Sequence, residues 1–247
     1  MAKKKMSLKS GLMQLWVLVS LTLMGIGASA AGQQAAADGG GRGAGPSVQG
    51  EQLTLFTFVG HIEQNGASLV AYGYLTHIFG IDDADLFTGS FPPANPADSA
   101  RYTFVTNGAF VSRFVVGDGT PGKTVFNLVA DVSTTYYFED QGAHGCVGTP
   151  DQCTPDPGPF MSGTPIAKSV GRDSDVNSVI APNQGVLSGS AEMTLVSTAV
   201  KHAAQAPFPL WKPGVKVRIT YVGDAVRTDP NGPKSYSLIV GQGTVIR

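Results

Sequence analysis

The chain has 247 residues, of which 17 are basic and 18 are acidic, and its net charge is −1. Four basic residues and no acidic ones fall within the first 30 positions, so the remainder carries 13 − 18 = −5. A mildly acidic protein lacks the basic surface that nucleic acids and anionic membranes bind, so we expect neither as a partner.

The N-terminus has the three-part layout of a secretory signal peptide. Four lysines precede the apolar run 12–26, and the small residues 27–30 follow it. Polar residues break this run, which is shorter than the ~20 residues of a bilayer span. We therefore expect cleavage after Ala30, which gives a signal peptide at 1–30, and no membrane span in the mature chain. The mature protein is predicted to be secreted or periplasmic.

Two regions follow the signal peptide. Residues 31–50 are predicted to form a disordered Gly/Ala-rich linker, because Val48 is their only β-branched or aromatic residue. Residues 51–247 have about the length of one domain. Their apolar residues recur in short β-branched and aromatic runs bounded by Gly, Pro, Asn and Asp, without a sustained helical period. The sequence predicts a single all-β domain here.

Three Asn-Gly dipeptides separate predicted strands, at 65–66, 107–108 and 231–232. Asn-Gly favours a two-residue hairpin turn, because both central residues of that turn adopt positive φ. We interpret all three as hairpin turns, with a bulge inside one long strand as the alternative at 107–108. Pairing about the first turn would place His61 opposite Val70.

The strand count and connectivity predict an antiparallel meander of about 8–10 strands closed into a barrel. Closure removes exposed sheet edges, and the hairpins suit an up-and-down order. A two-sheet β-sandwich is the alternative. An outer-membrane barrel fits less well, because several strands carry charge on one face instead of a continuous apolar band.

The two cysteines, Cys146 and Cys153, lie in a segment rich in Gly, Pro and Asp, which indicates a loop. Cysteines of an exported protein are expected to pair. Their number and spacing suit neither a zinc site nor a redox motif. We predict a disulfide bond that fixes loop 142–166, a region in which function is often found.

Residues Gly117–Thr124 read GDGTPGKT and match the phosphate-loop pattern GxxxxGK[ST]. That motif binds phosphate only where its Lys and Thr open a helix. Here the following run is rich in Val, Thr, Tyr and Phe, which favours a strand. We interpret the segment as a loop between two strands and expect no cofactor.

The run 173–178, DSDVNS, places Asp173, Asp175 and Asn177 at the first, third and fifth positions of a calcium-loop pattern. The sixth and twelfth positions are Ser178 and Gln184, whereas the pattern requires Gly and Glu. We interpret the run as a solvated loop, with a metal site as the alternative.

No catalytic residue can be assigned from the sequence. The histidines are scattered, at His61, His77, His144 and His202. A barrel could still bring together carboxylates from different strands, for which the candidates are Glu63, Asp131, Glu139 and Glu192.

These observations predict a secreted, non-catalytic β-domain that binds a small apolar ligand inside the barrel or a partner through its loops. One alternative is an extracellular or periplasmic enzyme, a hydrolase or an isomerase, on the same scaffold. Another is a surface structural protein. A deep pocket with a carboxylate or histidine would favour the enzyme, a hollow apolar interior the binding protein, and a filled interior the structural role.

Overall fold

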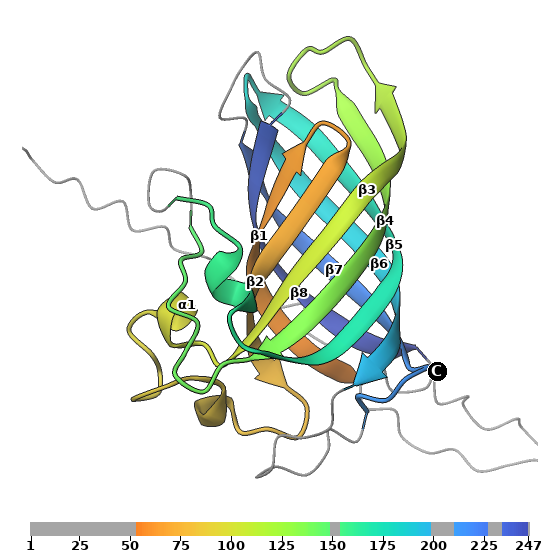
Figure 1. The fold of residues 1–247 in the computed structure, drawn as a ribbon. Helices are drawn as coiled ribbons and strands as arrows, with labels where there is room; N and C mark the ends of the chain where they lie inside the picture. The colour runs from red at the N-terminus through yellow and green to blue at the C-terminus, as the bar shows by residue number, and fades with distance from the viewer. Residues whose placement is uncertain (1–52, 149–153, 199–209, 227–233, 247) are drawn as a thin grey trace, which may run out of the picture. The chain divides into compact units, whose positions relative to one another are not determined.

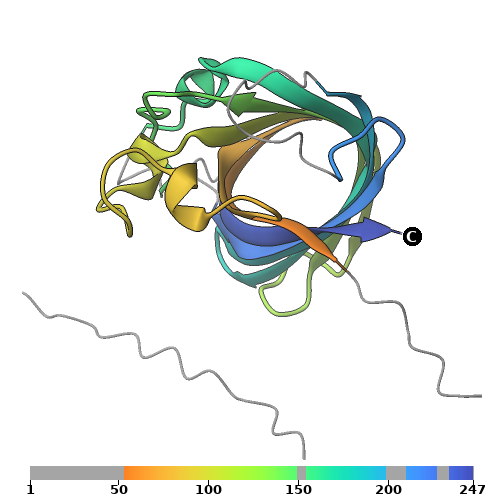
Figure 2. The same ribbon diagram turned by 90° about the horizontal axis from the view of Figure 1, so that it is seen from below.

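The computed structural model describes residues 53–148, 154–198, 210–226 and 234–246. In these residues eight strands form a closed antiparallel barrel, in which each strand pairs with its sequence neighbours and β1 also pairs with β8 (Figures 1 and 2). The predicted all-β barrel is confirmed, and the sandwich alternative is wrong. The strands are β1 (Thr54–Asn65), β2 (Ser68–Ile78), β3 (Tyr102–Val116), β4 (Val125–Phe138), β5 (Thr164–Ala181), β6 (Gln184–Thr198), β7 (Lys216–Val226) and β8 (Lys234–Ile246).

Within the described ranges, three short helical segments lie between strands: η1 (Asp83–Leu86), α1 (Pro96–Ser99) and η2 (Gly158–Met161). None of the helices in the described part of the chain has the length and apolar character that crossing a membrane requires. The predicted signal peptide, the predicted linker, Cys153 and the third Asn-Gly dipeptide lie outside the described residues.

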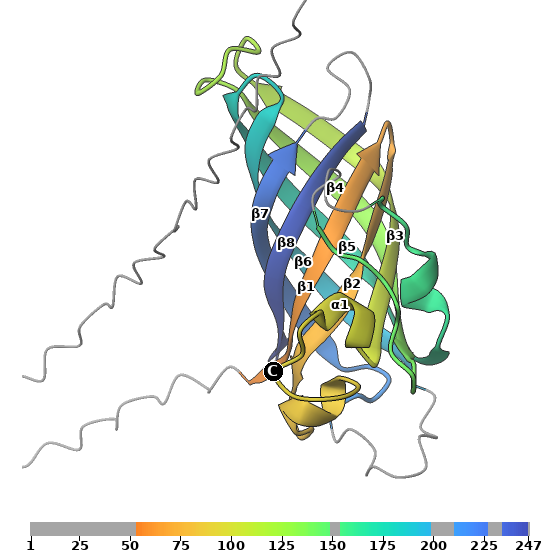
Figure 3. The ribbon, with the colours of Figure 1, turned by 90° about the vertical axis from the view of Figure 1, so that its left-hand side faces the viewer.

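The two ends of the barrel are built differently. At the upper end in Figure 1, the two-residue turns 66–67 and 182–183 and the loop 117–124 join successive strands. At the lower end, residues 79–101 join β2 to β3, and the described parts of 139–163 join β4 to β5. These longer connections fold against the outside of the barrel beside β1 and β2 (Figures 1 and 3).

The first predicted hairpin is present, but its register differs from the prediction. Asn65 pairs with Ser68, and His61 lies opposite Tyr72 instead of Val70. The turn residues are thus 66 and 67, and Gly66 takes the positive φ of 61°. A turn with glycine at its first central position keeps Asn65 in the strand, which moves the pairs from Phe58 to Asn65 by two residues.

The hairpin predicted at Asn107-Gly108 is wrong, and the alternative of one long strand is correct. β3 continues through this dipeptide and pairs with β4 along its length, with a register shift between Phe110 and Ser112. Gly108 serves the interior packing, because a Cβ at this position would lie 2.8 Å from Val132 Cγ1.

Aromatic side chains fill the lower part of the barrel interior. Phe56, Tyr136 and Trp211 form an aromatic plug, in which the Phe56 ring lies 5.8 Å from each of the other two and Tyr136 meets Trp211 edge-on at 4.8 Å. Above them Phe58 packs against Phe104 at 5.3 Å. All five side chains are buried, so the lower end of the barrel is closed by hydrophobic packing.

A second apolar layer covers the outer face of β1, β2 and β3. The Phe160 ring of η2 lies 5.2 Å from Tyr72, and the Phe160 carbonyl accepts a hydrogen bond of 2.7 Å from Thr103 Oγ1. His61 stacks on Tyr72 at 5.4 Å. Burial lowers the pKa of His61, which favours the neutral form of its ring. This histidine belongs to the outer packing layer, not to the barrel interior.

Candidate ligand-binding site

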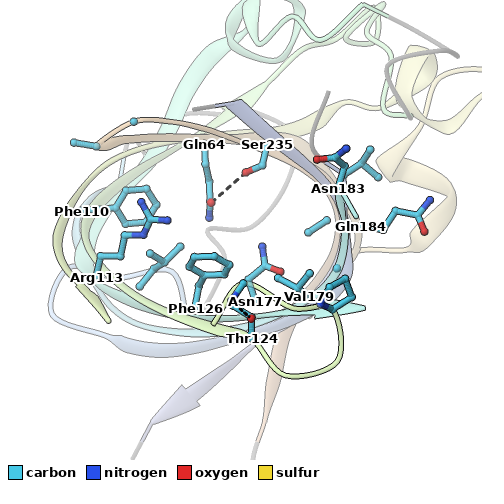
Figure 4. Close-up of a pocket in the computed structure, with 18 of the residues that line it drawn as sticks. Gln64, Phe110, Arg113, Thr124, Phe126, Asn177, Val179, Asn183, Gln184 and Ser235 are labelled. Atoms are coloured by element: carbon cyan, nitrogen blue, oxygen red, sulfur yellow. Dashed lines mark hydrogen bonds between the residues drawn. The ribbon is translucent and has the colours of Figure 1, made fainter. Parts of the chain in front are cut away.

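The upper end of the barrel holds an open cavity of about 740 Å³, which we call the mouth pocket. Its lining comes from the upper ends of the strands and from their turns (Figure 4). The apolar part of the lining includes Phe110, Phe126, Leu128, Val179, Pro182, Ala225 and Val226. The polar part includes Gln64, Arg113, Asn177, Asn183, Gln184 and Ser235.

The polar groups of the mouth pocket are mostly neutral amides and hydroxyls. Ser235 Oγ donates to Gln64 Oε1 at 3.2 Å across the seam between β1 and β8 (Figure 4). Arg113 lies over the ring of Phe126, with 5.1 Å between its guanidinium carbon and the ring centroid. The pocket thus combines apolar surface with a few polar groups, which is typical of small-molecule sites.

A pair of buried carboxyl groups lies inside the barrel below the mouth pocket. Asp173 and Asp175 alternate with Ser174 on β5, so both side chains face inward. Tyr221 of β7 reaches them across β6, and its hydroxyl is hydrogen-bonded to Asp173 Oδ2 at 2.7 Å and to Asp175 Oδ1. We call these three residues the carboxyl–tyrosine cluster.

Gly189 of β6 makes the carboxyl–tyrosine cluster possible. It pairs with Asp175 on one side and with Tyr221 on the other, so all three residues share one rung of the barrel. A side chain at Gly189 would occupy the space in which the tyrosine hydroxyl meets the carboxyl group. Glycine is therefore required at this position, because the side chains of Asp175 and Tyr221 approach each other here from the strands on either side of β6.

Burial holds a proton on the carboxyl–tyrosine cluster. Desolvation, followed by the charge of Asp173, raises the pKa of Asp175 to about 8, and desolvation raises the pKa of Asp173 to about 6. A phenol has one proton and can donate to only one acceptor. The arrangement is satisfied when protonated Asp175 donates to Tyr221 and Tyr221 donates to ionised Asp173. The pair then carries one negative charge near neutral pH.

The carboxyl–tyrosine cluster lies between the mouth pocket and a smaller cavity. Asp175 pairs with Leu128 across β4 and β5, and it is two residues from Asn177; both neighbours line the mouth pocket. Asp173 and Tyr221 line a cavity of about 50 Å³ beneath it. Asp173 Oδ1 has no hydrogen-bond partner among the described residues. The small cavity has room for water but not for a drug-sized molecule.

The solvated-loop interpretation of DSDVNS is wrong. Asp173, Asp175 and Asn177 lie in the middle of β5 on its inner face, because their spacing of two follows the strand period. Asp173 and Asp175 share Tyr221, whereas Asn177 faces the mouth pocket. No group of three or more His, Cys, Asp or Glu side chains placed to hold a metal is found in the part of the chain that the structure describes.

The carboxylates predicted as strand candidates do not meet inside the barrel. Asp131 and Glu192 are exposed and form ion pairs with Arg172 and Arg218 at 2.9 and 2.8 Å. Glu139 follows the end of β4, and its carboxylate accepts from Ser162 Oγ at 3.4 Å. Glu63 of β1 is adjacent to Ile62, whose buried side chain faces the interior, so Glu63 points outward.

The described histidines lie outside the mouth pocket. His77 contacts Asp83 at 2.8 Å and His144 contacts Asp98 at 3.4 Å, both near the surface. His202 lies outside the described residues.

The phosphate-loop match is a loop between β3 and β4, as its context predicts. The Thr124 hydroxyl accepts from Gly119 N at 2.8 Å and donates to the Thr120 carbonyl at 3.1 Å, so it stabilises the loop itself. Because Cys153 lies outside the described residues, its bond with Cys146 stays a prediction.

Together these features define a closed antiparallel barrel that is packed below, holds buried carboxyl groups at its centre and opens into a ligand-sized cavity above. No known protein family, no curated protein and no solved structure matches the chain.

Proposed function

We propose that the protein is a non-catalytic binding protein that holds a small, largely apolar ligand in the mouth pocket. The observation that carries this proposal is the pocket of about 740 Å³ at the upper end of the barrel. Small-molecule sites have volumes of about 300–1,000 Å³ and mostly apolar walls with a few polar groups. The rings of Phe110 and Phe126 and the aliphatic side chains of Leu128 and Val179 give this pocket the same character.

The proposed location is outside the cytoplasm. Support comes from the sequence alone, through the signal-peptide pattern of residues 1–30 and the closely spaced cysteines Cys146 and Cys153. A secreted or periplasmic binding protein would capture its ligand from the medium. A surface structural role has less support, because the eight strands close into a barrel, and the unpaired edge is short, on the β2 side of β3 beyond Ala109.

The test is binding of the neutral fluorescent probe N-phenyl-1-naphthylamine to the protein and to two matched tryptophan variants. Val179 lines the mouth pocket, whereas the next residue, Ile180, is 57% exposed. Val179→Trp should lower probe affinity about tenfold or more by filling the pocket, and Ile180→Trp should leave it unchanged. Absence of probe binding, or equal loss in both variants, would contradict the proposal. If the probe binds as expected, native mass spectrometry of the protein from its own source would identify the retained ligand.

The carboxyl–tyrosine cluster favours a second candidate function, an enzyme that transfers a proton on a bound ligand. A buried carboxyl pair that shares a proton is a common acid–base arrangement. In such a reaction the ionised carboxylate would remove a proton from carbon and the protonated partner would donate to the carbonyl oxygen, which requires the end of the ligand to pass from the mouth pocket into the small cavity that Asp173 lines.

This second candidate can be tested without its natural substrate. The probe is 2-octanone in heavy water, because proton transfer would exchange the hydrogens next to its carbonyl group for deuterium. Exchange that is faster than in buffer, abolished by Asp175→Asn and retained by the exposed-site control Asp131→Asn, is the expected result for an enzyme. Exchange at the buffer rate would leave the binding protein as the function of the barrel.

A further inference from the structure

Arg113 faces the mouth pocket because of a β-bulge. Residues up to Phe110 alternate so that even-numbered side chains of β3 face the interior, and the register then shifts between Phe110 and Ser112. Beyond the shift Arg113 pairs with Leu128, which lines the pocket, and both side chains lie on the same face. The bulge thus turns Arg113 inward, while Phe114 is left 66% exposed. Bulges that re-aim a side chain in this way are common next to functional sites.

In the part of the chain that the structure describes, the guanidinium group of Arg113 has no acidic partner. Among the described residues no carboxylate lies within ion-pair distance of it, whereas Arg172 and Arg218 on the outer surface are each paired. Its position is fixed instead by the ring of Phe126, at 5.1 Å (Figure 4). A cation held over an aromatic face keeps its N–H groups available to another acceptor.

The charge of the pocket lining also points to an anion. Arg113 is its only side chain with a formal charge in the described ranges, and the other polar members are amides and hydroxyls. The single negative charge of the carboxyl–tyrosine cluster lies below the pocket, beyond Leu128. An anionic group would therefore be stabilised at the wall beside Arg113 and disfavoured toward the centre of the barrel.

We propose that Arg113 is an anion-binding subsite and that the ligand of the mouth pocket is an apolar molecule bearing one carboxylate. The inference rests on the proposed binding function and adds the chemical class of the ligand. The planar guanidinium presents two parallel N–H groups, a geometry that matches the two oxygens of a carboxylate. The apolar part of the ligand would contact Phe110, Phe126 and Val179.

The experiment compares octanoate, 1-octanol and octylamine by isothermal titration calorimetry near neutral pH. These probes share a chain and differ in the charge of the headgroup. Octanoate should bind about tenfold more tightly than 1-octanol, in line with a charge-assisted hydrogen bond. Arg113→Gln should abolish this difference by weakening octanoate alone, and Arg113→Lys should retain part of it. Arg172→Gln, which removes a cation from the outer surface, should change neither affinity.

The outcomes separate the two proposals. Equal binding of octanoate and 1-octanol, tighter binding of octylamine, or equal loss of both probes in Arg113→Gln would overturn the anion subsite and leave the binding function standing. If none of the three probes binds and N-phenyl-1-naphthylamine does not bind either, the proposed binding function is itself wrong.

Discussion

The lower end of the barrel is filled by aromatic rings, whereas the upper end encloses open volume, although the same eight strands form both. At the lower end Phe56, Tyr136 and Trp211 meet at centroid distances of 4.8 to 5.8 Å. At the upper end the pocket lining includes the rings of Phe110 and Phe126, but other lining positions carry small or polar side chains, such as Ala225, Asn177 and Ser235. Alternation thus forms the wall of the barrel, while side-chain size determines which part becomes a core and which part a pocket.

Substitutions at the two ends of the barrel should differ most in how much they lower the free energy of unfolding. Phe56→Ala, which removes a ring from the aromatic plug, should lower the free energy of unfolding by about 3–5 kcal/mol through the cavity that it leaves. Phe114→Ala at the upper end should cost less than about 0.5 kcal/mol, because that ring is 66% exposed. Denaturant unfolding followed by tryptophan fluorescence measures both. Similar losses in the two variants would remove the distinction between a packed and an open end.

The carboxyl–tyrosine cluster, which lies between the two ends of the barrel, should make the free energy of unfolding depend on pH. Burial raises the pKa of Asp175 to about 8 from its ordinary value of 3.8, so the folded protein holds a proton that the unfolded chain releases. The contribution of this carboxyl group to stability is therefore greatest below about pH 4 and declines as the pH rises toward about 8. Asp175→Asn mimics the protonated acid, so this variant should lack the part of the decline that is due to Asp175.

The measurement is the free energy of unfolding of Asp175→Asn and of the unmodified protein over a series of pH values. The variant should be more stable by on the order of 4 kcal/mol near pH 7 and nearly equal near pH 4. Asp131→Asn, on the outer surface, serves as the control and should leave the shape of the pH curve unchanged. A constant difference between variant and parent at all pH values would show that Asp175 does not hold a proton.

A smaller effect is expected from the tyrosine of the same cluster. Tyr221→Phe removes the hydroxyl that lies between Asp173 and Asp175, which should cost about 1–3 kcal/mol of stability. Because the hydrogen bond that Tyr221 donates lowers the pKa of Asp173, the pKa of this carboxyl group should rise further in the variant. Carbon NMR titration of the aspartate carboxyl groups measures this rise. The half-buried Tyr137 offers the control Tyr137→Phe, which should not move either titration.

The smallest effect concerns the outer surface, where carboxylates are paired and exposed. The side chains of Asp131 and Arg172 lie 2.9 Å apart and are 57% and 65% exposed. Their coupling energy in a double-mutant cycle should stay below about 1 kcal/mol and should decrease with added salt. A coupling energy above about 1 kcal/mol that does not change with salt would contradict this prediction. The exposed Asp131 would then stabilise the fold as a buried carboxyl group does.

The barrel was largely predictable from the sequence because alternation and turn residues are local signals. Their limits appear at glycines. Asn107-Gly108 has the composition of a turn, yet Gly108 lies within β3, where it makes room for Val132. At Asn65-Gly66 the sequence predicts the turn correctly, but the strand pairs next to it are shifted by two residues from the predicted ones. The dipeptide does not determine which of its residues adopts positive φ, because that depends on how the two strands pair.

The candidate site was much less predictable. The polarity of DSDVNS indicates a loop, although its carboxylates are two residues apart, which also fits one face of a strand. Tyr221, whose hydroxyl is hydrogen-bonded to both carboxyl groups, lies 46 positions beyond Asp175 in the sequence. No sequence pattern around Tyr221 indicates this role. Arg113 turns inward only through a bulge, whose position depends on pairing between β3 and β4. Such contacts arise from tertiary structure, which one sequence does not display.

The pairing of β1 with β8 has a consequence for how the protein folds. Every other strand pair joins neighbours in sequence, but this one joins Thr54 to Thr244 and thus spans nearly the whole described chain. Its closure must overcome the largest loss of chain entropy, which is typical of slow-folding topologies. During synthesis β1 therefore waits with an unpaired edge until β8 has been made. Any factor that shields that edge would raise the yield of folded protein.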